Sequence, residues 1–183
     1  MFVTTECDTA NGRVQRGLTV SSFTTICLTP SPFICFSTRQ TSRAADLISL
    51  RGTFIVHLLA CTPHSVKIAE AFSKSDLAPH SSANIQNPFE LGKWRRDCLW
   101  QLPILDGVLG ALLCKVDKAV HVGDHKLWIA EVQDVITECS SRSALGYCDR
   151  KYRREGEPIW PYDTSEESNE TKHGKYSSVV VIT

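Results

Sequence analysis

The sequence has no excess of charge of either sign, because 20 Lys and Arg residues balance 20 Asp and Glu residues. Bulk charge therefore gives no support to nucleic-acid binding, which favours a strongly basic surface. No apolar run approaches the roughly 20 residues that a membrane span needs. The opening stretch, MFVTTECDTANG, lacks the basic segment and the long apolar segment of a secretory signal, and no transit peptide is recognisable. We expect an intracellular, cytoplasmic protein that binds neither nucleic acid nor membrane.

Common cofactor and catalytic motifs are also missing. The chain contains no G-x-G-x-x-G, G-x-x-x-x-G-K-[ST], G-x-S-x-G or H-E-x-x-H. Its 8 Cys residues include no C-x-x-C pair, and several lie in apolar runs, where a thiol acts as a small hydrophobic group. For a chain with no export signal we expect these thiols to be reduced. A nucleotide, if bound, is not held by a Rossmann or P-loop device.

The apolar residues that are present, 42% of 183, are enough for one domain with its own core. Alternating or continuous apolar runs predict strands at 18–28, 32–38 and 53–60, and two long strands within 107–139 that meet at the turn VGDH. Helices are expected from Ser42 to Gly52 and within 65–74. Without βαβ alternation, these short strands favour a closed or partly closed antiparallel barrel with a few flanking helices. Residues 1–154 form the expected domain, and residues 155–183 a polar, flexible tail.

Two clusters of hydroxyl side chains interrupt the apolar runs. Three Thr and two Ser lie within Thr19–Thr25, and a second cluster, STRQTSR, occupies residues 37–43. In a continuous strand Thr19, Ser21 and Phe23 would share one face, and Val20, Ser22 and Thr24 the other. Buried hydroxyls need partners. They either pair across strands or form the polar edge of a ligand site, such as one for a flavin ring.

The second cluster leads into a helix and offers a candidate anion site. Ser42 is a favourable N-cap, and a helix N-terminus presents backbone N–H groups and partial positive charge. Arg39 and Arg43 flank it and suit a phosphate group. The alternative is that Ser42 only caps the helix and both arginines are solvated.

His121 and His125 flank the VGDH turn, with Asp124 between them and Cys114 nearby in sequence. This set leaves three interpretations open: a zinc site, plain turn residues, or a ligand contact by His125 where a strand begins. A zinc pair spaced by four residues suits one helical face, whereas here a turn intervenes.

Five segments together resemble the flavin reductase-like family, whose fold is the FMN-binding split barrel. In family order they are RGLTVSSFTTICLTP, PFICFSTRQTSRAADLI, GTFIVHLLA, VGDHKLWIAEVQDV and ALGYCDRKYRR. They span residues 1–154. Family members usually carry a helix before the first strand, and the expectation is that MFVTTE is what remains of that region here.

The resemblance implies a mainly β, antiparallel split barrel that binds FMN or FAD and uses NAD(P)H as co-substrate. It also implies a homodimer, with a monooxygenase as a possible recipient of reduced flavin. By residue, Thr19, Val20, Ser21 and Ser22 would border the flavin ring. Ser37, Thr38, Arg39, Ser42 and Arg43 would surround its phosphate, and His125 would lie near the nicotinamide. No catalytic side chain is implied, because the flavin carries the chemistry.

Two other functions fit the same residues. A retained flavin would act directly on an organic substrate in a biosynthetic pathway, with Phe89, Trp94 and Trp100 shaping its pocket. Otherwise these aromatics cover the barrel end or a dimer seam. The third possibility is a non-catalytic flavin- or haem-binding module.

Overall fold

The computed structural model describes residues 1–10, 12–75, 87–138 and 143–154. The predicted tail at 155–183 lies outside these residues. The helices are α1 (Arg43–Arg51), α2 (Pro63–Ser75) and the 3-10 helix η1 (Pro88–Glu90). The strands are β1 (Phe2–Thr9), β2 (Gly12–Thr19), β3 (Thr24–Cys27), β4 (Phe33–Arg39), β5 (Thr53–Leu58), β6 (Trp94–Arg96), β7 (Pro103–Leu105), β8 (Gly110–Val122), β9 (His125–Thr137), β10 (Leu145–Cys148) and β11 (Lys151–Arg154). No helix in the described ranges is both long and apolar enough to cross a bilayer.

One antiparallel sheet dominates the molecule. Its strands run in the order β2-β1-β5-β8-β9-β4-β3, and two separate hairpins pair β6 with β7 and β10 with β11. This confirms the mainly β, antiparallel class and the long hairpin β8–β9 around the VGDH turn. Within the described part of the chain no ladder joins β2 to β3, so the hydrogen-bonded order starts and ends at these two strands.

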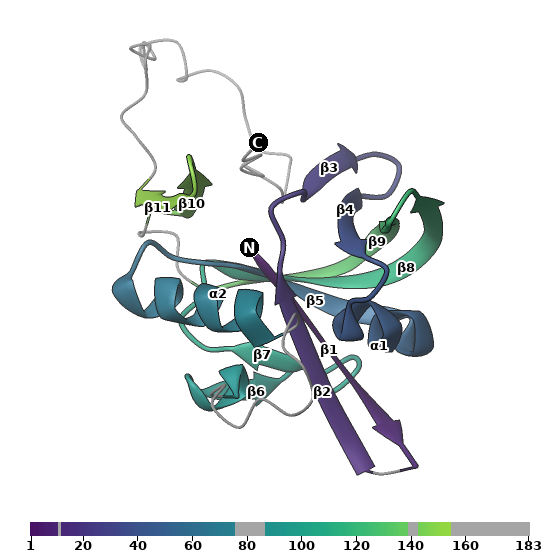
Figure 1. Ribbon diagram of the computed structural model, residues 1–183, viewed down its shortest axis with the longest axis horizontal. Coiled ribbons are helices and arrows are strands. Elements are labelled where there is room, and N and C mark those ends of the chain that lie inside the picture. The colour runs from purple at the N-terminus through teal and green to yellow at the C-terminus, as the bar shows by residue number, and fades with distance from the viewer. Residues whose placement is uncertain (11, 76–86, 139–142, 155–183) are drawn as a thin grey trace, which may run out of the picture.

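The two helices pack on different sides of the first strands (Figure 1). Phe2 on β1 belongs to a core cluster that includes Ile68 and Phe72 of α2. The next residue, Val3, packs in the main core with Ala44 and Ile48 of α1, as the alternation of a strand requires. The sheet is therefore covered by α2 on one side and by α1 on the other.

Helix α1 begins and ends as local chemistry dictates. The hydroxyl of Ser42 accepts a 3.1 Å hydrogen bond from the N–H of Ala45, which confirms the predicted N-cap. Gly52 closes α1 with a left-handed φ of 73°, a conformation that a glycine adopts at little cost. At Gly17 a Cβ atom would lie 2.5 Å from the Phe72 ring, so this glycine lets α2 approach β2 closely.

The strand predicted at 18–28 is wrong in its middle. β2 ends at Thr19 and β3 begins only at Thr24. Val20 and Phe23 are both buried in the main core. Residues three apart point to opposite faces of a strand, so burying both in one core requires the chain to leave the strand between them.

The aromatic segment after α2 packs on the core. Phe89 lies 5.2 Å from Phe72, centroid to centroid, and 5.0 Å from Trp94. Trp94 in turn packs edge-on against Phe2 at 6.3 Å. These contacts favour the interpretation in which the aromatics cover one end of the fold.

Candidate functional site

The two hydroxyl clusters meet at one pair of residues. The Ser22 hydroxyl accepts a 2.9 Å hydrogen bond from the N–H of Ser37, and the two hydroxyl oxygens lie 3.0 Å apart. Ser22 belongs to the loop between β2 and β3, and Ser37 to β4, so the break in the first strand makes this contact possible. The structure therefore brings the two clusters into contact at Ser22 and Ser37, and the prediction that they serve one binding site stays a prediction.

Strand register places two further predicted residues beside this pair. Arg39 on β4 lies opposite His125 on β9, and Ser37 lies opposite Leu127. Cross-strand partners share a face of the sheet, and so do residues two apart. Ser37, Arg39, His125 and Leu127 therefore lie on the same face. We call Ser22, Ser37, Arg39 and His125 the outer-face cluster.

The turn that carries Arg39 is tied to the tip of the β8–β9 hairpin. The N–H of Gln40 donates to the Asp124 carbonyl oxygen at 2.9 Å, and the Gln40 side chain donates to the Gly123 carbonyl oxygen at 2.9 Å. The N–H of Ser42 donates to the Arg39 carbonyl oxygen at 3.1 Å. This network fixes the position of Arg39 relative to His125.

His125 and Asp124 form an exposed pair at that tip. The ring nitrogen Nδ1 of His125 lies 2.7 Å from Asp124 Oδ1, and the His125 side chain is 42% exposed. The hydrogen bond from His125, followed by its charge, lowers the pKa of the Asp124 carboxyl below its usual value. Asp124 thereby orients the imidazole and leaves the Nε2 side of the ring available to a ligand.

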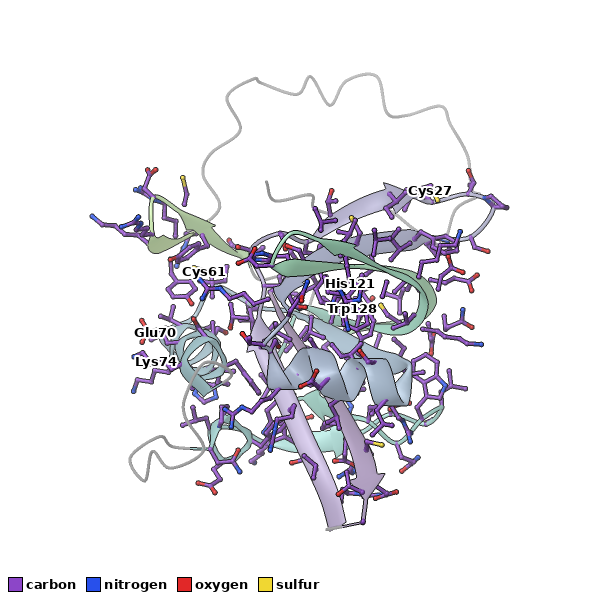
Figure 2. The ribbon with its side chains drawn as sticks, turned by 45° about the vertical axis from the view of Figure 1, so that its right-hand side comes forward. Cys27, Cys61, Glu70, Lys74, His121 and Trp128 are labelled. Carbon is purple, nitrogen blue, oxygen red and sulfur yellow. The ribbon has the colours of Figure 1, made fainter. Side chains whose placement is uncertain are left out.

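The zinc interpretation gains no support from the geometry. Cys114 is buried in the main core, where burial raises the pKa of its thiol, whereas His121 and His125 lie on the exposed end of the hairpin. Figure 2 shows His121 at the hairpin, away from the labelled Cys27 and Cys61. Within the described ranges no three His, Cys, Asp or Glu side chains group as metal ligands do.

Three other predicted residues have structural partners. The Thr19 hydroxyl donates to the Ala69 carbonyl oxygen of α2 at 2.6 Å. The Thr38 hydroxyl is buried and accepts a 2.9 Å hydrogen bond from the indole N–H of Trp128. Val20 is part of the main core. Their side chains are therefore occupied by contacts within the fold, and flavin binding by these three residues stays a prediction.

The remaining predicted residues, Ser21, Ser42 and Arg43, lie outside the strands. Ser21 is exposed next to Ser22. Ser42 is buried under its capping bond, and the Arg43 side chain lines a hollow beside Gly17 of β2. The structure thus does not bring Arg43 to the outer-face cluster. Phosphate binding by Ser42 and Arg43 stays a prediction.

Sequence reasoning missed a group of apolar residues next to the cluster. Val120 pairs with Leu127, and Val122 pairs with His125, so both valines share the outer face. They are 44% and 58% exposed, which is high for valine. The alternation of Val120 and Val122 along β8 was the signal available in the sequence.

Comparison with known proteins identifies the family. Residues 1–156 match the family described as "Flavin reductase like domain". The chain belongs to the flavin reductase-like family. This confirms the resemblance drawn from the five sequence segments, and it covers all strands described above.

The names of individual relatives agree with the assignment of this chain to the flavin reductase-like family. It is 33% identical over 156 residues to the NADH-dependent flavin reductase StyB of Pseudomonas fluorescens, covering 83% of this chain and 79% of that protein. It is 29% identical over 150 residues to an NADH:FMN oxidoreductase of Rhodococcus qingshengii, covering 80% of this chain and 71% of that protein. The solved styrene monooxygenase flavin reductase of Pseudomonas putida S12 is 28% identical with a TM-score of 0.64, covering 86% of this chain and 92% of that structure.

Proposed function

We propose that this chain catalyses the reduction of FMN or FAD by NAD(P)H and binds the flavin at the outer-face cluster. The observation that carries the proposal is the Ser22–Ser37 contact, which joins two hydroxyl-rich segments in a chain whose residues 1–156 match flavin reductase-like domains. The named relatives act on NADH together with FMN or an unspecified flavin. Retention of one flavin for an organic substrate is less favoured, because Phe89 and Trp94 pack inward.

The donor set of the cluster fits a flavin. A flavin presents carbonyl and N–H groups along one ring edge, hydroxyls on its ribityl chain and a terminal phosphate. Ser22 and Ser37 offer hydroxyls, and the loop 20–23, which lies outside any strand, offers backbone groups. Arg39 offers a guanidinium for the phosphate. Leu127 offers apolar surface for the ring.

The protein's part in the reaction is positioning. When bound, the flavin supplies the redox chemistry by taking up a hydride from the reduced nicotinamide, which requires the two rings in contact at roughly 3–3.5 Å. Ser22 and Ser37 orient the ring edge, and Arg39 holds the phosphate end. His125, oriented by Asp124, would contact the nicotinamide side. None of these residues needs to transfer a proton for the hydride to move.

We further propose that a second copy of this chain covers the outer face. Ile26, Leu28, Val120 and Val122 are 44–58% exposed. By strand register Val120 and Val122 adjoin Leu127 and His125. A partner packed on these side chains would remove them from water and exclude water from the flavin at the same time. Reduced flavin would then pass to a separate oxidising enzyme, such as a monooxygenase, and one solved relative is named as the flavin reductase of a styrene monooxygenase.

The test is an assay of purified protein with NADH or NADPH and with FMN, FAD or neither. Flavin-dependent oxidation of the pyridine nucleotide supports the proposal. A flavin that stays bound but is never reduced would leave only the non-catalytic binding module. For assembly, Val120→Lys should convert a dimer into a monomer in light scattering, whereas Leu50→Lys, on the exposed face of α1, should not. A monomeric parent with full activity contradicts the dimer.

A further inference from the structure

The inner face of β4 and β9, opposite the outer-face cluster, carries a hydrogen bond between two buried side chains. The Thr38 hydroxyl accepts a 2.9 Å bond from the indole N–H of Trp128, and the two residues are 3% and 1% exposed. Trp128 belongs to the main core together with Ala44 and Ile48 of α1, so this face of the sheet looks toward that helix (Figure 2). The bond therefore joins β4 to β9 inside the core, in addition to their backbone ladder.

Lys126 completes this arrangement. By register it lies opposite Thr38 on the neighbouring strand. Its ammonium group lies 5.0 Å from the centroid of the Trp128 ring and donates a 3.1 Å hydrogen bond to the Ser49 hydroxyl of α1. A cation over the face of a Trp ring is attracted to it, so Lys126 restrains the indole from one side. We call Thr38, Lys126 and Trp128 the inner-face brace.

The brace and the outer-face cluster alternate along the same two strands. Thr38 lies between Ser37 and Arg39 on β4, and Lys126 follows His125 on β9. Consecutive residues of a strand point to opposite faces, so Thr38 and Lys126 are bonded through the backbone to residues of the cluster. A shift of the brace within the close-packed core must therefore move the cluster as well.

Arg39 is the member of the cluster that most needs this support. It is the last residue of β4, where a strand opens more readily than at its centre. Its side chain is exposed, so its position depends on the backbone around it. The hydrogen bonds of Gln40 hold the residue after Arg39, and the brace holds Thr38, the residue before it.

Core packing alone does not require a polar pair at this position. A Val side chain has nearly the shape of Thr, and replacing both partners of a buried hydrogen bond by apolar groups of similar shape can be nearly neutral for stability. A hydrogen bond differs from an apolar contact because it is directional. It fixes the Thr38 side chain relative to the indole ring, and with it the backbone beside Arg39.

We propose that the Thr38–Trp128 hydrogen bond positions Arg39 to meet the phosphate of the flavin. The inference rests on the proposed function for its choice of ligand. Thr38 acts through the backbone, because its hydroxyl is occupied by Trp128 on the inner face. The bond should therefore control two measurable quantities, which are the opening of the backbone around Arg39 and the affinity for a phosphate-bearing flavin.

Amide hydrogen exchange, followed by NMR without ligand, measures the positioning directly. The N–H of Gln40 donates to the Asp124 carbonyl oxygen and the N–H of Ser42 to the Arg39 carbonyl oxygen, so both amides report on the turn that carries Arg39. Thr38→Val keeps the shape but removes the acceptor, and both amides should then exchange about ten-fold faster. Thr38→Ser keeps the hydroxyl and should restore both rates to within about two-fold of the parent.

Thr5→Val is the matched control. The Thr5 hydroxyl is also buried and donates a 2.9 Å hydrogen bond to the Thr53 carbonyl oxygen, but three strands separate β1 from β4 in the sheet. This variant should lower the melting temperature as Thr38→Val does, yet leave the two reporter amides unchanged. The double variant Thr38→Val, Trp128→Phe removes the bond without leaving a buried N–H unpaired, and its reporter amides should also exchange faster. Equal acceleration in Thr5→Val, or parent rates in both Thr38→Val variants, overturns the proposal.

Fluorescence titration with FMN extends the test to the ligand. Thr38→Val should weaken FMN binding about five-fold or more, and Thr38→Ser should not. In an Arg39→Ala background Thr38→Val should add less than about two-fold, because residues that act as one unit are not additive. A full further loss in that background would overturn the assignment to Arg39. A parent that binds no FMN overturns the proposed function alone, and the exchange rates then decide whether the bond positions Arg39.

Discussion

The hydroxyl of Ser22 lies 3.0 Å from the hydroxyl of Ser37, although Ser22 belongs to the loop between β2 and β3, Ser37 belongs to β4, and the two are 15 positions apart. The contact forms because the chain leaves β2 at Val20 and returns to the sheet at Thr24. It gives the predicted flavin site its most direct structural support.

Ser22→Ala should weaken flavin binding. The change removes the acceptor of the Ser37 N–H and one hydroxyl of the pair, a loss of about 1 kcal/mol or about five-fold in Kd. The double variant with Ser37→Ala should cost less than the sum of the two single changes, because the residues interact. Fluorescence titration with FMN measures each Kd. Ser73→Ala, an exposed serine of α2, is the control. Additive losses would show that the two hydroxyls act independently.

Arg39→Ala should weaken the binding of FMN but not the binding of riboflavin. If Arg39 binds the phosphate, its removal weakens FMN binding by about 1.5–3 kcal/mol, or about ten- to a hundred-fold. Riboflavin has no phosphate, so its affinity should barely change. Equal losses for both ligands would make Arg39 a structural residue of the β4–α1 turn.

His125→Ala should raise the KM for the pyridine nucleotide and leave the flavin affinity unchanged. The imidazole is oriented by Asp124 at 2.7 Å on the exposed hairpin tip, where a second ring would stack on the flavin. We expect a higher KM for NAD(P)H with flavin affinity within two-fold of the parent. Loss of bound metal together with a lower melting temperature would instead support the zinc interpretation. Unchanged kinetics would show that His125 does not contact the pyridine nucleotide, and would not affect the proposed flavin contacts of the other residues.

His57 should make the protein sensitive to acid. It is fully buried, stacked on Phe2 at 4.3 Å, and burial lowers its pKa to about 3. In the unfolded chain the pKa is about 6.5, so below that pH the unfolded state binds more protons and is favoured. The contribution of neutral His57 to the free energy of unfolding is complete above about pH 6.5. As the pH is lowered from there to about pH 3, this contribution falls by about 1.4 kcal/mol per pH unit.

Urea unfolding at pH 7 and pH 5 measures this effect. The parent should lose about 2 kcal/mol over that interval from His57 alone. His57→Asn should reduce the loss by that amount, whereas His64→Ala on the exposed start of α2 should not. An unchanged pH dependence in the His57 variant would show that another group controls acid sensitivity.

Arg150→Gly should stabilise the β10–β11 hairpin. Asp149 and Arg150 form its turn with φ of 52° and 60°, in the left-handed region. Such a conformation costs a residue with a Cβ about 1 kcal/mol relative to glycine. Thermal unfolding should show a gain of that order. Arg153→Gly lies in β11 and should destabilise instead, because glycine weakens a strand.

Local patterns predicted most of the fold. The N-cap at Ser42, the left-handed Gly52 and the alternation in β8 and β9 each depend on neighbours in sequence, and each is confirmed. The break at 20–23 was missed because it depends on tertiary burial. Strand propensity favours continuation there, and only the joint burial of Val20 and Phe23 opposes it.

The candidate site follows the same division between local patterns and tertiary packing. Hydroxyl clustering placed Ser22 and Ser37 among the candidate residues, and the structure brings them into contact, whereas their binding of a flavin stays a prediction. Sequence alone did not show that the Thr38 hydroxyl is occupied by Trp128, or that Arg43 leaves the turn on the side of β2. The Thr38–Trp128 hydrogen bond joins side chains that are 90 positions apart. The position of Arg43 depends on how α1 packs beside β2, so neighbouring residues in the sequence do not reveal it.

The most direct test of the central claim is an anaerobic mixing experiment. The parent protein is mixed with NADH and either FMN or FAD, and the visible absorption of oxidised flavin is followed with time. We predict rapid, stoichiometric bleaching of at least one flavin by NADH, and slower bleaching at subsaturating flavin with the Ser22→Ala, Ser37→Ala variant. Absorption that persists with both flavins, and with NADPH in place of NADH, in a protein that remains folded would contradict the account.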